Sequence, residues 1–434
     1  MTGITMDKDK LTKLSDTLRD KLEFLKQEED YEDELQVEEK SLSSGDALKK
    51  DLPEGDLKEK LEQNRIRKFR MRVTIGAIVA VIVMAFFLYN KLYTFTDYVI
   101  AESFDNTAAA GSDYVAVGKN LYRYNSDGVS CVTRENEMLW SITYNMQAPI
   151  VDICGETMVI ADQQGNQIYV VNQDGLVGNF ESLLPILKVR VSKQGVVAAV
   201  LQEDDITWVN LYKADGTSIA NDKTTVAESG YPLDIDLSPN GEKLAVSYLG
   251  VQEGNITSNV IFYHFGSAGQ SQKNNVVSST TFMETVVPEI YFNSNSEAVA
   301  VTDEGFVVFK GNDTPEPSVE VTFDEEIVSA FHDENRIGFL FNSEEEGYKY
   351  RMELYTYEGK KKTTRQISAD FDTIKIENEQ ILMYGDKNCD IFTLSGQKRF
   401  SSAYEKDIAN IFYFSEYRKY LVITNDSFDR IRIS

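Results

Sequence analysis

The sequence predicts an all-β protein whose main domain is a β-propeller, preceded by a single membrane-spanning helix. Three observations lead to this fold class. Short β-rich runs alternate with turn residues beyond about residue 97, two kinds of hairpin recur in a fixed order, and eighteen residues without a charge, 73–90, directly follow a basic segment. We expect the helix to divide the 434-residue chain into a small inner part and a large outer domain.

Residues 1–64 are predicted to form an acidic cytoplasmic tail that is partly helical or disordered. Leucines recur at spacings of three and four, which is typical of one stripe of an amphipathic helix: Leu11, Leu14, Leu18, Leu22 and Leu25. Residues 41–55 read as a linker, and a second short helix is expected from about Leu57. Two interpretations stay open. The tail is either mostly disordered, or its leucine stripe docks on a cytoplasmic partner or on itself.

Residues 65–72 form a basic juxtamembrane segment, and residues 73–92 are the predicted transmembrane helix. The basic flank consists of Arg65, Arg67, Lys68, Arg70 and Arg72. The apolar residues that mark the span are Val73, Ile75, Ile78, Val81, Ile82, Phe86, Phe87 and Leu88. Because cationic residues accumulate on the cytoplasmic side of a span, this asymmetry predicts a single-pass protein of the plasma membrane with its N-terminus inside.

A buried helix or a cleaved signal peptide accounts less well for the apolar run. A buried helix of a soluble protein could be as apolar, but it would not require the one-sided basic flank. A cleaved signal peptide normally starts within the first few residues and has a shorter apolar core, whereas this run starts at residue 73. A retained signal anchor fits both features.

Beyond the span, the first recurring hairpin is a strand that ends in a polar turn and is followed by a strand of small apolar residues. We find it at 189–198, 235–246, 291–300 and 412–422. The second hairpin is an aromatic-rich strand closed by a glycine, for which we expect the positive φ that a tight turn requires. The closing glycines are Gly128, Gly175, Gly216, Gly266, Gly311, Gly359 and Gly396.

The spacing of these glycines predicts a propeller over residues 97–434. Four short strands with their turns consume roughly 40 residues, the length of one blade. A pair of β-sandwiches is the alternative, but a sandwich has no reason to repeat two hairpins in one order. The last unit, from about Asp407, holds three strands, and residues 97–105 can supply the fourth. That closure gives eight blades; a closing strand near residues 138–144 would instead give seven.

The repeats resemble those of bacterial quinoprotein-like and WD40-like propellers, and the stretch Leu237–Ala245 is similar to a hairpin common in them. The layout of acidic tail, single span and propeller resembles an uncharacterised family of single-pass envelope proteins of Gram-positive, clostridia-like bacteria. The Gly-His and Trp-Asp pairs of true WD40 blades are absent, and Leu139-Trp140 is an unrepeated match to the quinoprotein tryptophan motif. The resemblance therefore implies the fold and the cell envelope, without a cofactor.

Composition narrows the classes of function. The net charge of −26 disfavours nucleic acid, whose binding requires Lys and Arg gathered on one face. Three widely spaced cysteines, Cys131, Cys154 and Cys389, are expected to be buried free thiols, although their number also allows one disulfide. The acidic runs 324–326 and 344–346 lack the alternation of a calcium loop and are expected in solvated turns.

We find no catalytic motif, and we expect no catalytic, cofactor-binding or metal-binding residue. The two histidines, His264 and His332, are expected to be tolerated strand residues, and Trp140 and Trp208 to be packing residues. The sequence therefore predicts a membrane-anchored platform that binds a protein or an envelope ligand without catalysis. The alternative is an enzyme with a cofactor or metal in the central funnel.

Overall fold

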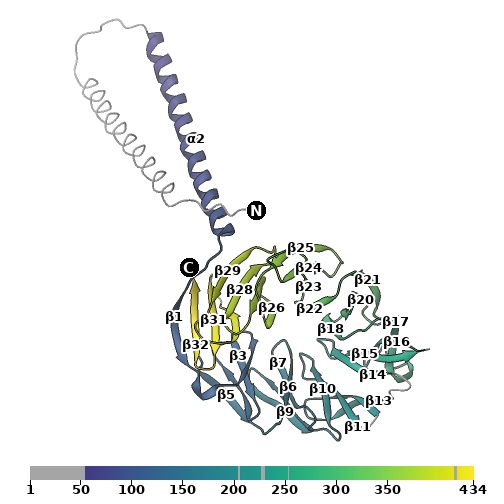
Figure 1. Ribbon diagram of the computed structural model, residues 1–434. Coiled ribbons are helices and arrows are strands. Elements are labelled where there is room, and N and C mark those ends of the chain that lie inside the picture. The colour runs from purple at the N-terminus through teal and green to yellow at the C-terminus, as the bar shows by residue number, and fades with distance from the viewer. Residues whose placement is uncertain (1–53, 204–205, 226–229, 253, 415–417) are drawn as a thin grey trace. The chain divides into compact units, whose positions relative to one another are not determined.

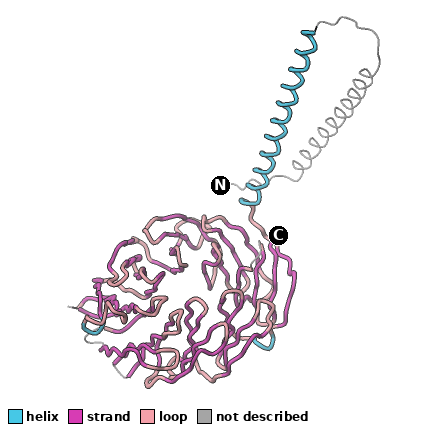
Figure 2. Tube along the Cα trace, turned by 180° about the vertical axis from the view of Figure 1, so that it is seen from behind, coloured by secondary structure: helices cyan, strands magenta, loops and turns pink. Residues whose placement is uncertain are grey.

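The computed structural model describes residues 54–203, 206–225, 230–252, 254–414 and 418–434. The chain forms two compact units, Met1–Leu88 and Tyr89–Ser434. The predicted tail and its leucine stripe therefore lie almost wholly outside the described residues. In the ring unit, Figure 1 shows sheets arranged around a common axis, and Figure 2 shows that this unit is built almost entirely of strands and turns.

Helix α2 spans Glu54–Leu92 without interruption, so the short helix expected from Leu57, the basic flank and the apolar run belong to one element. The described side chains from Arg65 to Ala85 are exposed. Among the described residues, we find no helix that is both long and apolar enough to cross a bilayer. The membrane anchor stays a prediction.

The ring contains eight four-stranded antiparallel sheets, which we number as blades 1–8. Blades 1 and 2 comprise β2 (Asp113–Val117), β3 (Asn120–Asn125), β4 (Gly128–Val132), β5 (Met138–Thr143), β6 (Pro149–Cys154), β7 (Thr157–Asp162), β8 (Gln167–Asn172) and β9 (Gly175–Glu181). Blades 3 and 4 comprise β10 (Ile186–Val191), β11 (Val197–Glu203), β12 (Ile206–Tyr212), β13 (Ser218–Thr225), β14 (Tyr231–Leu237), β15 (Lys243–Gln252), β16 (Asn255–His264) and β17 (Val276–Met283).

Blades 5 and 6 comprise β18 (Glu289–Ser294), β19 (Glu297–Thr302), β20 (Gly305–Lys310), β21 (Glu316–Thr322), β22 (Ile327–His332), β23 (Arg336–Asn342), β24 (Tyr350–Thr356) and β25 (Lys361–Ile367). Blades 7 and 8 comprise β26 (Thr373–Glu377), β27 (Gln380–Tyr384), β28 (Asn388–Thr393), β29 (Lys398–Ala403), β30 (Ile408–Tyr413), β31 (Lys419–Thr424), β32 (Ser427–Ile433) and, from the other end of the chain, β1 (Tyr98–Asp105). Short 3₁₀ helices occur at Thr107–Ala109 and Lys273–Asn275.

The ring closes as predicted, by pairing the first and last strands. Strand β1 runs antiparallel to β32, with Tyr98 opposite Ile433 and Asp105 opposite Ser427. The seven-blade alternative is wrong, because β5 pairs with β4 and is the outer strand of blade 1. Closure through the outer strand leaves β30, the inner strand of blade 8, next to the axis like the first strand of every other blade.

The segment before β1 also joins two blades. The backbone N–H of Phe95 donates to the Arg399 carbonyl at 2.8 Å, and the Ser401 N–H donates to the Phe95 carbonyl at 3.0 Å. The Phe95 ring is buried in the hydrophobic cluster shared by blades 7 and 8. The chain therefore covers part of the outer edge of β29 before it enters blade 8 as β1.

The hydrophobic core is a series of eight clusters, each between two neighbouring blades. The second strands, such as β11 and β19, are apolar on both faces because each face packs against a different neighbour. This explains why small apolar residues follow the polar turn of each first hairpin. All four sequence-predicted copies of that hairpin connect a first and a second strand.

The second hairpin required two corrections. Six of the seven glycines follow the third strand of a blade. Gly128 instead closes the turn between the second and third strands of blade 1, as the first residue of β4, where Asn-Ser-Asp-Gly resembles the later turns. Positive φ is found at Gly175, Gly216, Gly311, Gly359 and Gly396, whereas Gly128 and Gly266 do not have it. Gly266 belongs to a longer connection in which its N–H donates to His264 Nδ1 at 3.0 Å.

The third-to-fourth turns also need glycine for space. A Cβ atom on Gly216 would lie 2.7 Å from Cβ of Phe180, on the outer strand of blade 2. A Cβ atom on Gly359 would lie 2.9 Å from Val319 of blade 5, and one on Gly396 would lie 2.5 Å from Thr363 of blade 6. The outer strand of one blade thus crosses directly over the turn glycine of the next, which packs the blades closely.

Candidate functional site

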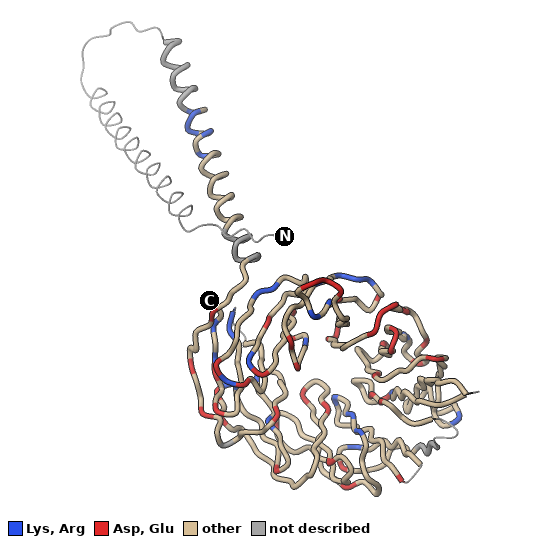
Figure 3. Tube along the Cα trace, viewed as in Figure 1, with Lys and Arg blue, Asp and Glu red and all other residues tan. Residues whose placement is uncertain are grey.

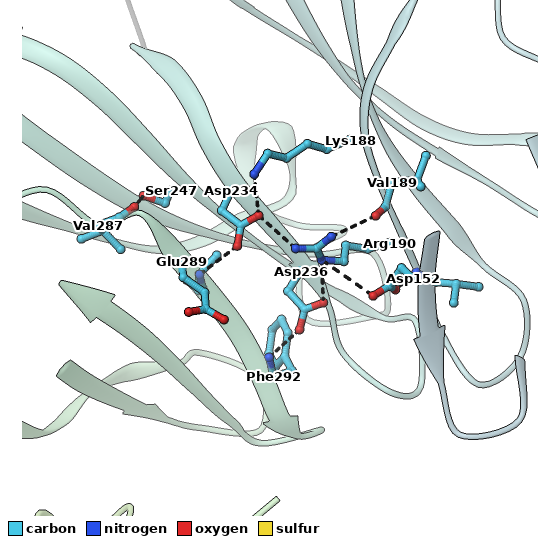
Figure 4. Close-up of polar contacts among 12 residues, drawn as sticks. Asp152, Lys188, Val189, Arg190, Asp234, Asp236, Ser247, Val287, Glu289 and Phe292 are labelled. Carbon is cyan, nitrogen blue, oxygen red and sulfur yellow. Dashed lines mark hydrogen bonds and ion pairs between the residues drawn. The ribbon is translucent and has the colours of Figure 1, made fainter. Parts of the chain in front are cut away.

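The first strands of the blades line the axis, and four consecutive ones carry charged side chains that meet. We call this group the axial charge cluster (Figure 4): Asp152 of β6, Lys188 and Arg190 of β10, Asp234 and Asp236 of β14, and Glu289 of β18. Residues two apart on a strand share one face, so the pairs on β10 and β14 point the same way. The cluster therefore follows from a Lys-Val-Arg strand lying beside an Asp-Ile-Asp strand.

Arg190 is the centre of the cluster. Its Nη2 lies 3.0 Å from Asp234 Oδ1, and its Nε lies 3.6 Å from Asp236 Oδ1 and 4.0 Å from Asp152 Oδ1. Lys188 Nζ adds a second contact to Asp234 Oδ1 at 3.0 Å. Two cations therefore face three close carboxylates, and Asp234 receives the best compensation.

Each of these carboxylates also accepts a hydrogen bond from the backbone of the next blade. Asp152 Oδ2 accepts from Val191 N at 2.7 Å, Asp234 Oδ2 from Ile290 N at 3.1 Å, and Asp236 Oδ2 from Phe292 N at 2.5 Å. First strands have one edge without a sheet partner, and a buried N–H without an acceptor is costly. The aspartates supply these acceptors and thereby connect blade 2 to blade 3 and blade 4 to blade 5.

Burial and mutual repulsion shift the acidities within the cluster. Burial, together with the nearby Asp152 carboxylate, raises the pKa of Asp236 to about 8. Burial also raises the pKa of Asp152, although Arg190 opposes the shift. The pKa of Arg190 is raised, because the attraction of the three aspartates outweighs its burial. The oxygens of the three aspartates are engaged by backbone and guanidinium groups, an arrangement that holds blades together.

A smaller charged group on the inner strands of blades 7 and 8 connects these two blades in a similar way. Lys375 Nζ of β26 lies 3.2 Å from Glu377, donates to Asn410 Oδ1 at 3.1 Å, and lies 4.1 Å from the centre of the Phe412 ring. Glu377 accepts a hydrogen bond from Tyr413 N of blade 8 at 3.0 Å. Burial lowers the pKa of Lys375 despite the nearby Glu377.

A separate cleft lies between blades 5 and 6, on the face of the ring that carries the first-to-second and third-to-fourth turns. We call it the blade 5/6 cleft; its volume is about 470 Å³. Its walls come from four turns and are formed by Asn293, Ser294, Ser296, Glu297, Lys310, Gly311, Asn312, Glu334, Asn335, Tyr357 and Glu358. Figure 3 shows acidic residues prominent on this side of the ring.

Internal contacts fix much of the cleft. Glu297 forms an ion pair with Lys310 at 2.8 Å and accepts a hydrogen bond from Asn293. At the floor, the Tyr357 hydroxyl donates to the Asp333 carbonyl at 2.6 Å. Lys243, which is 3% exposed, donates from Nζ to the Asn312 carbonyl at 2.5 Å and so holds the wall. The cleft is therefore shaped before any ligand binds.

The histidines, cysteines and tryptophans singled out in the sequence are spread over several blades of the ring. His264 is buried in β16, while His332 stacks on Tyr291 with 3.6 Å between the ring centres and lies 3.3 Å from Glu289 Oε1. Cys131 and Cys389 are buried and Cys154 is half-buried, and all three are free thiols, as expected. The tryptophans pack against hydrophobic clusters, and the acidic runs 324–326 and 344–346 lie between strands.

The sequence interpretation missed the axial charge cluster and the blade 5/6 cleft. The signal for the cluster was present as charged residues two apart within otherwise apolar first strands. In the part of the chain that the structure describes, no group of three or more His, Cys, Asp or Glu side chains is arranged to hold a metal ion.

Comparison with known proteins gives a family. The model described as "Family of unknown function (DUF5711)" matches residues 91–433 of this chain. No curated protein matches the chain.

Solved structures give only weak likenesses. BamB from Moraxella catarrhalis is 10% identical with a TM-score of 0.46, covering 78% of this chain and 100% of its own. A eukaryotic initiation factor is 15% identical with a TM-score of 0.46, covering 72% and 81%. The WD40 domain of Neurospora crassa Pan2 is 6% identical with a TM-score of 0.42, covering 79% and 97%. At such scores these likenesses carry no functional argument, and the eight blades rest on the strand pairing itself.

Proposed function

We propose that this chain, which belongs to the DUF5711 family because the family model matches residues 91–433, is a membrane-anchored, non-catalytic binding platform. Its ring would present turns and loops to a protein or envelope ligand outside the membrane. The anchor would be the apolar part of α2, with the basic residues 65–72 inside and the ring in the cell envelope, as in the Gram-positive envelope proteins that the sequence resembles.

One observation carries the proposal. The conspicuous charges at the axis are engaged in holding blades together, whereas the blade 5/6 cleft is a preformed polar cavity at the surface. A rigid ring whose open polar groups lie in turns is suited to recognition. A catalytic funnel would instead require free acids or bases converging on the axis.

The second candidate function is an enzyme with its chemistry in the central funnel. The observation that favours it is the pKa of about 8 at Asp236, which is suitable for general acid–base catalysis near neutral pH. Against it, Asp236 already accepts from Phe292 N at 2.5 Å and lies 3.6 Å from Arg190 Nε. We therefore place this function second.

Photo-crosslinking in cells would test the platform. The full chain would carry a photoreactive residue either at Asn335 or Tyr348 on the ring, or at Ser15 in the tail. We expect the ring positions to capture a discrete partner that is absent from a sample without illumination. Capture from the tail alone, or from no position, would contradict a platform that works through the ring.

A further inference from the structure

We propose that the blade 5/6 cleft binds a basic peptide segment by receiving a lysine or arginine side chain between Glu334 and Glu358. This inference deepens the proposed platform function and rests on it. The two glutamates lie on turns of blade 6 that follow β22 and β24, and both line the cleft. The cavity of about 470 Å³ can hold one long cationic side chain and part of the backbone beside it.

The charged residues that line the cleft favour a positively charged ligand over a negatively charged one. Three carboxylates and one lysine line it, and the Lys310 ammonium is engaged by Glu297 at 2.8 Å. Glu334 and Glu358 form no salt bridge within the part of the chain that the structure describes. Hydrogen bonding, together with the charges of Lys310 and Lys360, lowers the pKa of Glu358. An anion entering the cleft would meet two carboxylates without an ion-pair partner, while an ammonium or guanidinium group would gain two charged acceptors.

The neutral groups of the cleft suit a peptide. Asn312 and Asn335 line it beside the glutamates, and an amide side chain can both donate to a peptide carbonyl and accept from a peptide N–H. A saccharide normally uses an aromatic face as well. Among the described residues that line the cleft, the aromatic one is Tyr357, which is 4% exposed, so its ring offers no such face.

The turns that carry the two glutamates are already fixed by their own backbone hydrogen bonds. The glutamates come from separate turns, and each turn is fixed independently: Gly359 N donates to the Thr356 carbonyl at 2.9 Å, and Asp333 N donates to the Arg336 carbonyl at 2.9 Å. The buried Lys243 of blade 4 holds the far wall through the Asn312 carbonyl. Binding therefore requires little ordering of the protein, which favours affinity for a short segment.

Calorimetry with the full chain and defined peptides would test this inference at physiological salt. The probe is a tetralysine peptide, and its matched control is the same peptide acetylated on all four side-chain amines. We expect saturable one-site binding of tetralysine, and at least tenfold weaker binding of the acetylated peptide. Equal affinity for both peptides, or tighter binding of an N-acetylglucosamine disaccharide, would overturn the assignment of a cationic ligand.

Three variants would locate the site. Glu334→Gln with Glu358→Gln should weaken tetralysine binding at least tenfold, and Ser296→Tyr should weaken it similarly by filling the cleft without a change of charge. Glu181→Gln with Glu320→Gln removes the same charge from exposed strand positions on other surfaces and should leave the affinity unchanged. If the control pair weakens binding as much as the cleft pair does, the attraction is a general effect of the net charge of −26 and the site is wrong.

The same variants separate this inference from the platform function. If the cleft variants lose tetralysine binding yet still capture the cellular partner by crosslinking, the cleft binds a cation but the platform uses another surface. If tetralysine binds to the cleft and no partner is captured anywhere on the ring, the platform function fails and the cation site stands. If the cleft variants lose both tetralysine binding and capture of the cellular partner, the cation site and the platform function are both supported.

Discussion

Arg190 and Asp234 lie 3.0 Å apart across the boundary between blades 3 and 4, and Asp234 reaches on to the backbone of blade 5. One arginine and one aspartate thus connect three blades. Because Asp152 and Asp236 also lie within 4.0 Å of the Arg190 guanidinium, this side chain is the cation that the three aspartates share.

Replacing Arg190 should therefore destabilise the ring strongly. Arg190→Met leaves three carboxylates without their central partner, and removing one member of a buried ion pair typically costs about 3–5 kcal/mol. Because the Arg190 side chain is 26% exposed, we expect about 3 kcal/mol in urea unfolding. Lys119→Met, at an exposed turn, is the matched control and should change the free energy of unfolding by less than about 0.5 kcal/mol. A similar small loss in both variants would show that the cluster does not hold the blades.

The stability of the ring should fall as the pH rises from about 4 to about 8, because Asp236 ionises later in the folded protein than in the unfolded chain. Its pKa is about 8 in the folded protein, whereas an ordinary aspartate carboxyl has a pKa of 3.8, so the folded state retains a proton that the unfolded state has released. The resulting loss is absent below about pH 4 and complete above about pH 8. Asp236→Asn should therefore flatten the fall in urea midpoint across this range. If the urea midpoint of the wild type and of the variant falls equally across this range, a group other than Asp236 causes the fall.

Removing residues 427–434 should prevent the ring from folding. Strand β32 pairs with both β31 and β1, and it buries Phe428, Ile431 and Ile433 in the cores on either side of blade 8. We expect rapid and complete digestion of the truncated ring under conditions of limited proteolysis that leave the wild type intact. Removal of Ser434 alone deletes one backbone hydrogen bond to Asp97 and should have little effect. A protease-resistant ring without β32 would exclude closure as the source of stability.

The turn glycines should differ in their tolerance of a methyl group. Gly216 and Gly347 have similar φ values of +83° and +88°, but a Cβ atom would meet Phe180 at 2.7 Å in the first case and nothing within 4 Å in the second. Gly347→Ala should cost about 1 kcal/mol for the backbone conformation alone. Gly216→Ala should cost more, by about 1–3 kcal/mol for overpacking. Equal thermal shifts in the two variants would mean that Phe180 moves away freely.

The membrane anchor can be tested by introducing charge into α2. Ile78→Asp with Val81→Asp should release the full chain from membranes during alkaline extraction, because each charged residue at the centre of a span costs about 2.5–3.5 kcal/mol. The wild type should stay in the membrane pellet, as should Ser318→Asp, which alters an exposed residue of β21. A wild type that is extracted as readily as the double variant would contradict the anchor.

Much of the ring could be predicted from the sequence because its cause is local. In blades 3, 4, 5 and 8 an apolar second strand follows a polar turn, since these second strands are buried on both faces. The closure by residues 97–105 was predictable from a last unit with three strands. The prediction that Gly128 closes the same hairpin as the later glycines was wrong, because the β3–β4 turn has the same Asp-Gly pair as the turns at Gly175 and Gly216. A single sequence does not distinguish the two positions.

The axial charge cluster and the blade 5/6 cleft could not be predicted with the same means. Asp152, Arg190 and Asp234 are brought together by the order of blades around the axis, and the sequence does not state how far apart two inner strands lie. The cleft is formed by four turns from residues 293 to 358, each of which reads alone as an ordinary polar turn. Such sites depend on distances between blades, which short-range patterns do not contain.

The pairing of Tyr98 with Ile433 also sets the order in which this protein can be completed. Strand β1 is synthesised before the other strands of the ring, yet its partner β32 is the last strand of the ring to be synthesised. During synthesis β1 has no β32 to pair with until more than three hundred residues have followed it. Pairing between segments so far apart in the sequence is intrinsically slow. The ring therefore cannot mature blade by blade to a finished state. Closure requires residues 427–433, and a ring that lacks them keeps an open edge.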